Sequence, residues 1–154
     1  MQLNKKFLLS ILIISAHGAI ISMEQESELM KAWKIVNEAT HKANKEAKGQ
    51  AQLILNFTED SSTDVTRNRQ DMESVGTWLT QQRNNFPDEQ WKGLVHKLNS
   101  SVSSHIARCL CPETMKRFTV IEIIEDIAYP LKPGEDCSQL LANRIEEELK
   151  TITQ

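Results

Sequence analysis

The chain has 154 residues, of which 40% are hydrophobic, 25% charged and 5% aromatic, with a formal net charge of −3 at pH 7. This is the length of one domain, which excludes a large multidomain enzyme and a protein with several membrane spans. The ordinary charged fraction also argues against a wholly disordered chain.

The first 22 residues carry the three parts of a secretory signal peptide. Lys5 and Lys6 form a basic start, residues 7–16 are apolar and uncharged, and the small residues Gly18, Ala19 and Ser22 follow. The apolar run is shorter than the ~20 residues that a membrane-spanning helix needs. We therefore predict that residues 1–22 are a cleaved signal peptide, with a retained membrane anchor as the alternative. The mature protein is then secreted or periplasmic.

Cleavage after Ser22 leaves residues 23–154, which we interpret as a single α-helical domain. It removes two of the 18 basic residues and none of the 21 acidic ones, so the net charge becomes −5. An acidic chain without a clustered basic face is a poor match for nucleic acid. Once the signal peptide is removed, no remaining stretch predicts a membrane span.

Five stretches of the mature chain have apolar residues at helical spacing, separated by breaks rich in proline, glycine or polar residues. They cover about residues 24–57, 63–85, 87–109, 112–128 and 136–152. In the second stretch Gly76 lies within the apolar stripe, which predicts a close approach to another helix. Short connections and the lack of a convincing strand predict an all-α fold, a bundle of four or five helices.

The fourth stretch admits a second interpretation, because residues 118–124 are rich in the β-branched side chains typical of strands. Its acidic residues Glu122, Glu125 and Asp126, however, repeat at helical rather than alternating spacing. We therefore predict a helix there.

Three cysteines remain in the mature chain, and an oxidising compartment favours one disulfide and one leftover thiol. We predict a bridge of Cys137 with Cys109 or Cys111. Cys111 and Cys137 begin successive predicted helices, so a tight antiparallel hairpin would hold them about 24 Å apart. A disulfide needs Cα atoms within about 7 Å. The bridge therefore requires the proline-containing segment 129–136 to run back along the fourth helix in an extended conformation.

The same cysteines allow a weaker alternative, a metal site. His105 and Cys109 lie four residues apart and project from one side of the predicted third helix. Cys111 and Cys137 would complete a set of three thiolates and one imidazole, which suits zinc or Cu(I). The spacing matches no frequent structural-zinc pattern. We therefore predict no cofactor and keep these four residues only as metal candidates.

Three further residues are candidates for contacts at the surface. Trp78 falls outside the apolar stripe of its predicted helix, so it is either covered on a second side or anchors a partner. Asn56 and Asn99 begin the Asn-x-Ser/Thr sequons that glycosylation requires in a host with an endoplasmic reticulum. Asn56 lies beside a predicted loop, whereas Asn99 falls inside a predicted helix.

No catalytic arrangement emerges from the sequence. The chain lacks the Gly-x-Ser-x-Gly, His-Glu-x-x-His and phosphate-binding glycine motifs, and we predict no catalytic residue. We expect a secreted or periplasmic binding module that contacts another protein or a surface component without catalysis. Two alternatives stay open: a carrier that holds an apolar small molecule between helices, and a thiol/imidazole metal-binding or redox protein.

Overall fold

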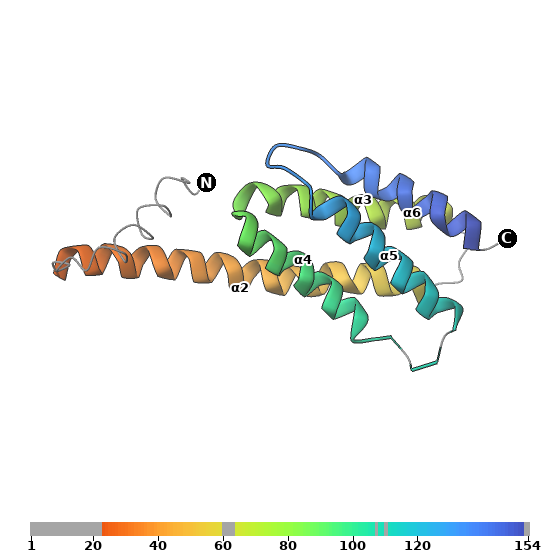
Figure 1. The fold of residues 1–154 in the computed structure, drawn as a ribbon, viewed down its shortest axis with the longest axis horizontal. Helices are drawn as coiled ribbons and strands as arrows, with labels where there is room; N and C mark the ends of the chain where they lie inside the picture. Colours follow the sequence, from red (N-terminus) through yellow and green to blue (C-terminus); the bar gives the residue numbers. More distant parts are fainter. Residues whose placement is uncertain (1–22, 60–63, 107, 110, 153–154) are drawn as a thin grey trace. The chain divides into compact units, whose positions relative to one another are not determined.

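The computed structural model of the chain describes residues 23–59, 64–106, 108–109 and 111–152, and the predicted signal peptide lies outside them. The described residues form five helices and no strand, which confirms the predicted all-α class (Figure 1). The helices are α2 (Met23–Glu59), α3 (Val65–Asn85), α4 (Asp88–Ser103), α5 (Pro112–Ala128) and α6 (Ser138–Ile152). The β-branched run at 118–124 is therefore helical, as the spacing of its acidic residues predicted.

Local sequence signals account for three of the helix starts. The Asp64 carboxylate accepts a hydrogen bond from the backbone N–H of Arg67 at 3.1 Å and so caps α3. Asp88 and Glu89 lie in the first turn of α4, where negative charge interacts favourably with the helix dipole. α5 begins with Pro112, whose missing N–H is not needed in a first turn.

The end of α4 differs from the prediction. The apolar stripe predicted a helix as far as Cys109, but α4 ends at Ser103. The serines around this end bond to the backbone of their own helix: Ser100 Oγ and Ser101 Oγ both donate to the Lys97 carbonyl, at 3.0 and 2.8 Å. Serine hydroxyls that compete for backbone carbonyls weaken the last turns of a helix. The apolar periodicity therefore overestimated its length.

The chain divides into two compact units, residues 1–43 and 44–154, and the division falls within α2. In the first unit the described residues are the N-terminal part of α2, where Met30, Trp33 and Ile35 are exposed. The second unit contains the rest of α2 together with α3, α4, α5 and α6.

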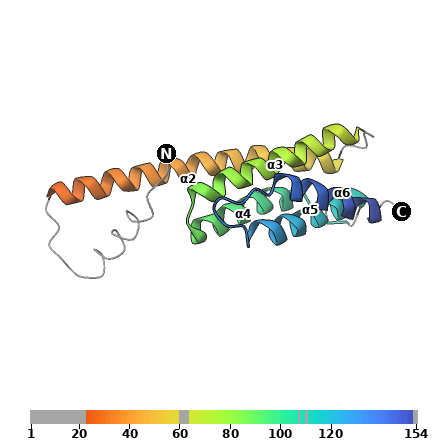
Figure 2. The same ribbon diagram turned by 90° about the horizontal axis from the view of Figure 1, so that it is seen from above.

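Within the second unit, α6 packs against α3 and α5, and α4 packs against α5. α5 and α6 run antiparallel (Figure 2). Their connection is held at the C-terminal end of α5 by residues of α3: Arg83 Nε donates to the Leu131 carbonyl at 2.6 Å, and Asn84 Oδ1 accepts from Gly134 N at 2.7 Å. Gly134 has a φ of 91°, a conformation that glycine adopts without strain. Gly134 therefore marks a turn within this connection.

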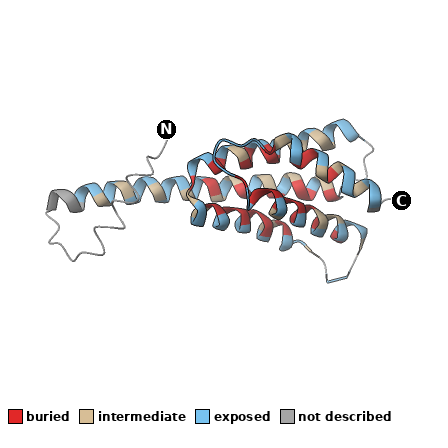
Figure 3. Cartoon of the chain, turned by 45° about the horizontal axis from the view of Figure 1, so that its top comes forward, coloured by how far each residue is buried: buried red, intermediate tan, exposed pale blue. Residues whose placement is uncertain are grey.

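The core of the second unit is formed by the faces that its helices turn towards one another (Figure 3). Trp91 is 1% exposed, and its indole Nε1 donates to the Ala128 carbonyl at 2.7 Å, which ties α4 to α5. The other large side chains with almost no exposure are mostly aliphatic: Ile54, Met72, Leu79, Leu98, Ile124, Leu141 and Ile145. A core of this kind stabilises the bundle chiefly by removing apolar surface from water.

Two helices, α3 and α6, approach each other closely at Gly76. A Cβ atom placed on Gly76 of α3 would lie 2.6 Å from Ser138 Cα at the start of α6, which is closer than side chains tolerate. This contact confirms the close helix approach predicted from the glycine in the apolar stripe. The neighbouring thiol, Cys137 Sγ, donates to the Gly76 carbonyl at 3.4 Å.

Two buried arginines hold the connections of the second unit in place. Besides Leu131, Arg83 donates to the Phe86 carbonyl at 2.9 Å and to the Asp88 carboxylate, and its guanidinium lies 5.7 Å from the centre of the Trp91 ring. Burying an arginine is costly unless its donors are satisfied. Here each bond falls on a turn or a helix end, so the arginine fixes where that connection runs.

The second buried arginine, Arg117 of α5, lies near the ends of α2 and α4. Its Nε donates to Thr58 Oγ1 at 3.2 Å, its Nη1 donates to the His105 carbonyl at 2.6 Å, and its Nη2 pairs with the Glu59 carboxylate. Arg117 therefore ties the C-terminal end of α2 to the connection that follows α4.

Candidate functional site

The structure does not support the predicted disulfide, because no two of the cysteines lie at bonding distance. The three cysteines are free thiols: Cys109 is exposed, Cys111 is partly exposed and Cys137 is buried. The bridge required segment 129–136 to run back along α5, but its bonds are to α3, from Arg83 and Asn84 to Leu131 and Gly134. Cys111 directly precedes the first residue of α5, whereas Cys137 lies beside Gly76 and Thr80 of α3.

The environment of Cys137 is that of an unreactive thiol. Its Sγ lies 3.4 Å from the Gly76 carbonyl oxygen and 3.5 Å from Thr80 Oγ1, and burial raises the pKa of the Cys137 thiol. The raised pKa keeps the thiol protonated, and the thiolate is the form that attacks disulfides or binds metal. Cys137 therefore serves to fill the contact between α3 and α6.

The four metal candidates are not brought together. No group of three or more His, Cys, Asp or Glu side chains lies close enough to hold a metal ion within the parts of the chain that the structure describes. The His105 ring is exposed, with Nδ1 lying 3.1 Å from the Ser101 carbonyl oxygen and 3.1 Å from Ser104 Oγ. Cys111 Sγ lies 3.1 Å from Thr114 Oγ1 at the start of α5.

Trp78, the candidate for a partner contact, lies in the α2–α3 packing. Its ring is only 6% exposed, and its Nε1 donates to the Glu46 carboxylate of α2 at 3.2 Å. Gln82 Nε2 donates to the same oxygen at 3.4 Å. Trp78 thus matches the alternative in which this side of α3 is covered.

The two sequons lie in different environments. Asn56 is exposed on α2, where Oδ1 accepts from Gln52 Nε2 at 2.8 Å. Asn99 is 3% exposed, and its Nδ2, the atom that a glycan would modify, donates to Glu125 at 3.2 Å. In the folded protein only the Asn56 amide is accessible to a transferase.

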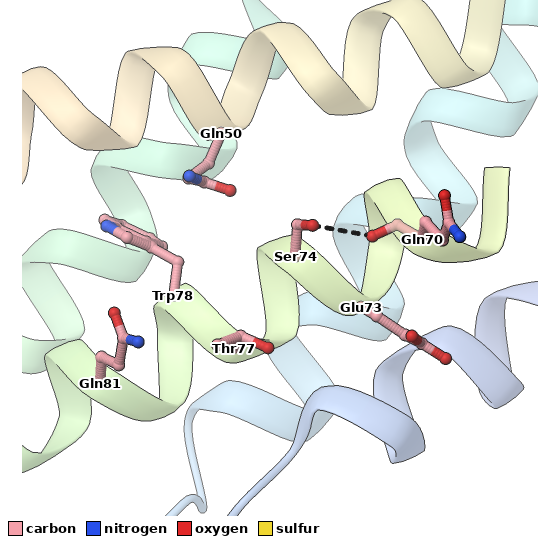
Figure 4. Close-up of a pocket in the computed structure, with 7 residues that line it drawn as sticks. All are labelled: Gln50, Gln70, Glu73, Ser74, Thr77, Trp78 and Gln81. Carbon is pink, nitrogen blue, oxygen red and sulfur yellow. Dashed lines mark hydrogen bonds between the residues drawn. The ribbon is translucent and has the colours of Figure 1, made fainter. Parts of the chain in front are cut away.

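A shallow hollow of about 470 Å³ lies between α2 and α3 (Figure 4). We call it the α2–α3 groove. Gln50 extends into it from α2, and the other lining side chains come from α3. The full set of lining residues is Gln50, Gln70, Glu73, Ser74, Thr77, Trp78 and Gln81.

The α2–α3 groove offers hydrogen-bonding groups beside the apolar ring of Trp78. The side-chain amide oxygen of Gln50, Oε1, is buried there without a hydrogen-bond partner. Ser74 Oγ donates to the Gln70 backbone carbonyl at 2.8 Å, and Glu73 Oε1 accepts from Arg69 Nε at 3.0 Å. Amides and hydroxyls of this kind suit reversible contact with a polar group, whereas apolar side chains predominate in most small-molecule pockets.

The other candidate surface lies on the first part of α2. Leu29, Trp33, Val36 and Thr40 are spaced by four, three and four residues, so they form one stripe along the helix, which we call the α2 stripe. Trp33 is 60% exposed, and the other three side chains are half-buried. Thr40 Oγ1 donates to the Val36 carbonyl at 2.8 Å, which satisfies its hydroxyl within the helix. The stripe is therefore apolar and partly open to solvent.

Charged side chains lie on the opposite side of α2 from the stripe. At 100° per residue, Lys31, Lys34 and Glu38 point away from the mean direction of the stripe. All three are exposed, and Lys31 pairs with Glu28 at 3.4 Å. The positions that flank the stripe hold uncharged residues, such as Ala32 and Asn37. A partner that covers the stripe would therefore desolvate no charged group of this segment.

The sequence contains the α2 stripe, but its periodicity alone predicts a face packed inside the protein. Burial is decided by what lies opposite, and a single helix pattern does not report that. The buried roles of Arg83 and Arg117 were missed for a similar reason. Their partners are mainly backbone carbonyls in distant turns, and carbonyls have no sequence signature.

No helix among the described residues is both long enough and apolar enough to cross a membrane. Comparisons of the chain with protein-family models, with curated proteins and with solved structures give no match.

Proposed function

We propose that the chain is an exported helical protein that acts by binding another protein, without covalent chemistry. The observation that carries this proposal is the α2 stripe, in which Trp33 leaves 60% of its surface open beside two aliphatic side chains. Tryptophan is among the residues that contribute most binding energy when a partner covers them. Contiguous exposed apolar surface is typical of interaction sites.

The charge pattern favours a protein over a membrane as the partner. A helix that lies in a lipid surface carries lysines along the edges of its apolar face, from where they reach the headgroups. Here Lys31 and Lys34 lie opposite the stripe and would point away from such a surface. The net charge of −5 after removal of residues 1–22 also opposes attraction to anionic lipid or nucleic acid.

The two alternative functions have less support. A carrier of an apolar small molecule needs an apolar cavity, whereas the α2–α3 groove is lined mainly by amides, hydroxyls and one carboxylate. A thiol/imidazole metal-binding or redox protein needs convergent ligands, whereas Cys137 packs against Gly76 of α3 and Cys111 lies beside Thr114 of α5. The binding module is therefore the function that the geometry supports best.

A photo-crosslinking amino acid at position 33 tests the proposal in the cells that produce the protein. We expect a discrete crosslinked product whose partner is a protein identified by mass spectrometry. The same group at position 34, on the opposite side of the helix, is the matched control and gives no such product. Equal crosslinking from both positions, or none from position 33, would overturn the proposal.

Export is tested separately by sequencing the N-terminus of the natural protein. We expect a chain that begins shortly after Gly18 or Ser22, recovered outside the cytoplasm. A natural protein that keeps residues 7–16 and remains in the cytoplasm would contradict export, whether or not position 33 contacts a partner.

A further inference from the structure

We infer that the α2 stripe binds the same stripe of a second copy of this chain, with the two helices antiparallel. The inference rests on the proposed function and specifies its partner. The stripe residues Leu29, Trp33, Val36 and Thr40 alternate spacings of four and three, which is the spacing of the seam between two paired helices.

Antiparallel pairing gives layers of similar volume. When Trp33 of one copy lies opposite Val36 of the other, Leu29 lies opposite Thr40, and the two-fold axis repeats both layers. A large side chain then faces a smaller one in each layer. In a parallel pair the two Trp33 indoles would meet in one layer and the two Thr40 side chains in another. Close packing therefore favours the antiparallel arrangement.

The residues beside the stripe fit a second copy equally well. The short or uncharged side chains of Ala32, Asn37 and Ala39 flank the stripe, so the helices can approach without burying a charge. Lys31 and Lys34 lie on the far side of each helix. Like charges of the two copies therefore stay apart, and the antiparallel helix dipoles do not oppose pairing.

Four layers bury less than the ~800 Å² per partner of a standard interface. We therefore expect a reversible dimer that forms in the micromolar range of protein concentration. Because Trp33 is largely exposed in one copy, its replacement should change association and leave the fold of the second unit intact.

Sedimentation velocity over a micromolar concentration series tests the inference on the purified natural chain. We expect a shift from monomer towards dimer with concentration. The substitution Trp33→Glu should weaken association by roughly tenfold or more, since a carboxylate would be buried in the contact. The matched control Lys34→Glu, on the opposite side of α2, should associate like the natural chain.

Disulfide trapping tests the orientation. In a Cys109→Ser, Cys111→Ser background, Leu29→Cys chains mixed with Thr40→Cys chains should crosslink faster than either chain alone. A chain that stays monomeric throughout, or a dimer unaffected by Trp33→Glu, would overturn the inference. If the chain is monomeric but position 33 still crosslinks to a different protein, the second copy is wrong and the proposed function stands. If both experiments fail, both proposals are wrong.

Discussion

The two parts of α2 have the same helical spacing of apolar residues but differ in how far these residues are buried. In the first part Trp33 is 60% exposed, whereas in the second part Ala47 and Ile54 are fully buried in the helical core. The comparison teaches that a stripe predicts which side of a helix seeks cover, and that only the tertiary structure shows whether cover is present. The second part contributes to stability, and we propose recognition as the role of the first.

The largest expected effect breaks the buried part of α2. Ile54→Ala removes a fully buried side chain and leaves a cavity, so we expect the free energy of unfolding to fall by about 2–5 kcal/mol. Chemical denaturation followed by circular dichroism measures the loss. A change below about 0.5 kcal/mol, the size typical of surface substitutions, would show that this part of α2 is not held in a packed core.

The next effect concerns the contact of α3 with α6. Gly76→Ala places a Cβ atom 2.6 Å from the backbone of Ser138, so one helix must move, and we expect a loss of about 3 kcal/mol. Gly93→Ala on α4 is the matched control, because nothing lies within 4 Å of a Cβ there. The control should be neutral or stabilising by about 1 kcal/mol, as alanine is the better helix former. Equal destabilisation by both changes would contradict the close approach.

A somewhat smaller loss is expected from Arg117→Met, which keeps much of the buried volume but removes the donors to Thr58 and to the His105 carbonyl. We expect a loss of about 2 kcal/mol, because buried acceptors would lose their partners. Arg67→Met at an exposed position of α3 is the control and should leave the denaturation midpoint unchanged. If the two variants unfold at the same denaturant concentration, the hydrogen bonds of Arg117 contribute nothing to stability.

Cys137 should make stability depend on alkaline pH. Burial raises the pKa of its thiol, so the folded chain keeps this proton at a pH where the unfolded chain releases it. The contribution is therefore intact below the ordinary thiol pKa of about 8.5 and is lost as pH rises above it. Denaturation at several alkaline pH values should show a fall that Cys137→Ala reduces and Cys109→Ala does not. If Cys109→Ala reduced the fall and Cys137→Ala did not, the thiol with the raised pKa would not be that of Cys137.

The smallest expected effect on stability sharpens the comparison within α2. Trp33→Ala, measured where the chain is monomeric, should change the free energy of unfolding by no more than about 0.5 kcal/mol. Its side chain is mostly exposed, so little apolar surface is returned to water on unfolding. A loss as large as that of Ile54→Ala would mean that Trp33 belongs to the core of the monomer.

The sequence was sufficient to predict the helices, because periodicity and caps are local. Pro112 marks a helix start, and Gly76 marked a close helix contact. The structure does not support the predicted cysteine pairing, which depended on the path of one connection. That path is set by Arg83 and Asn84, which are distant in sequence and bond to backbone atoms.

The candidate surfaces were less predictable than the fold. Trp78 and Trp33 both stand out in the sequence as large aromatic side chains on helices, yet one is covered by α2 and the other is open. Their exposure depends on which helices meet, and no spacing rule carries that information. The α2–α3 groove likewise depends on how two helices meet, since Gln50 comes from α2 and the other lining residues come from α3.

Fluorine NMR of the chain with fluorotryptophan at its three tryptophans tests the central claim most directly. Trp33→Phe assigns the resonance of Trp33, and Trp78 and Trp91 serve as internal controls. We predict that the Trp33 resonance shows solvent exposure in dilute solution and that it alone shifts as the chain is concentrated. A Trp33 resonance that is shielded from solvent at every dilution, or unchanged at every concentration, would contradict the claim that the α2 stripe is an open contact surface.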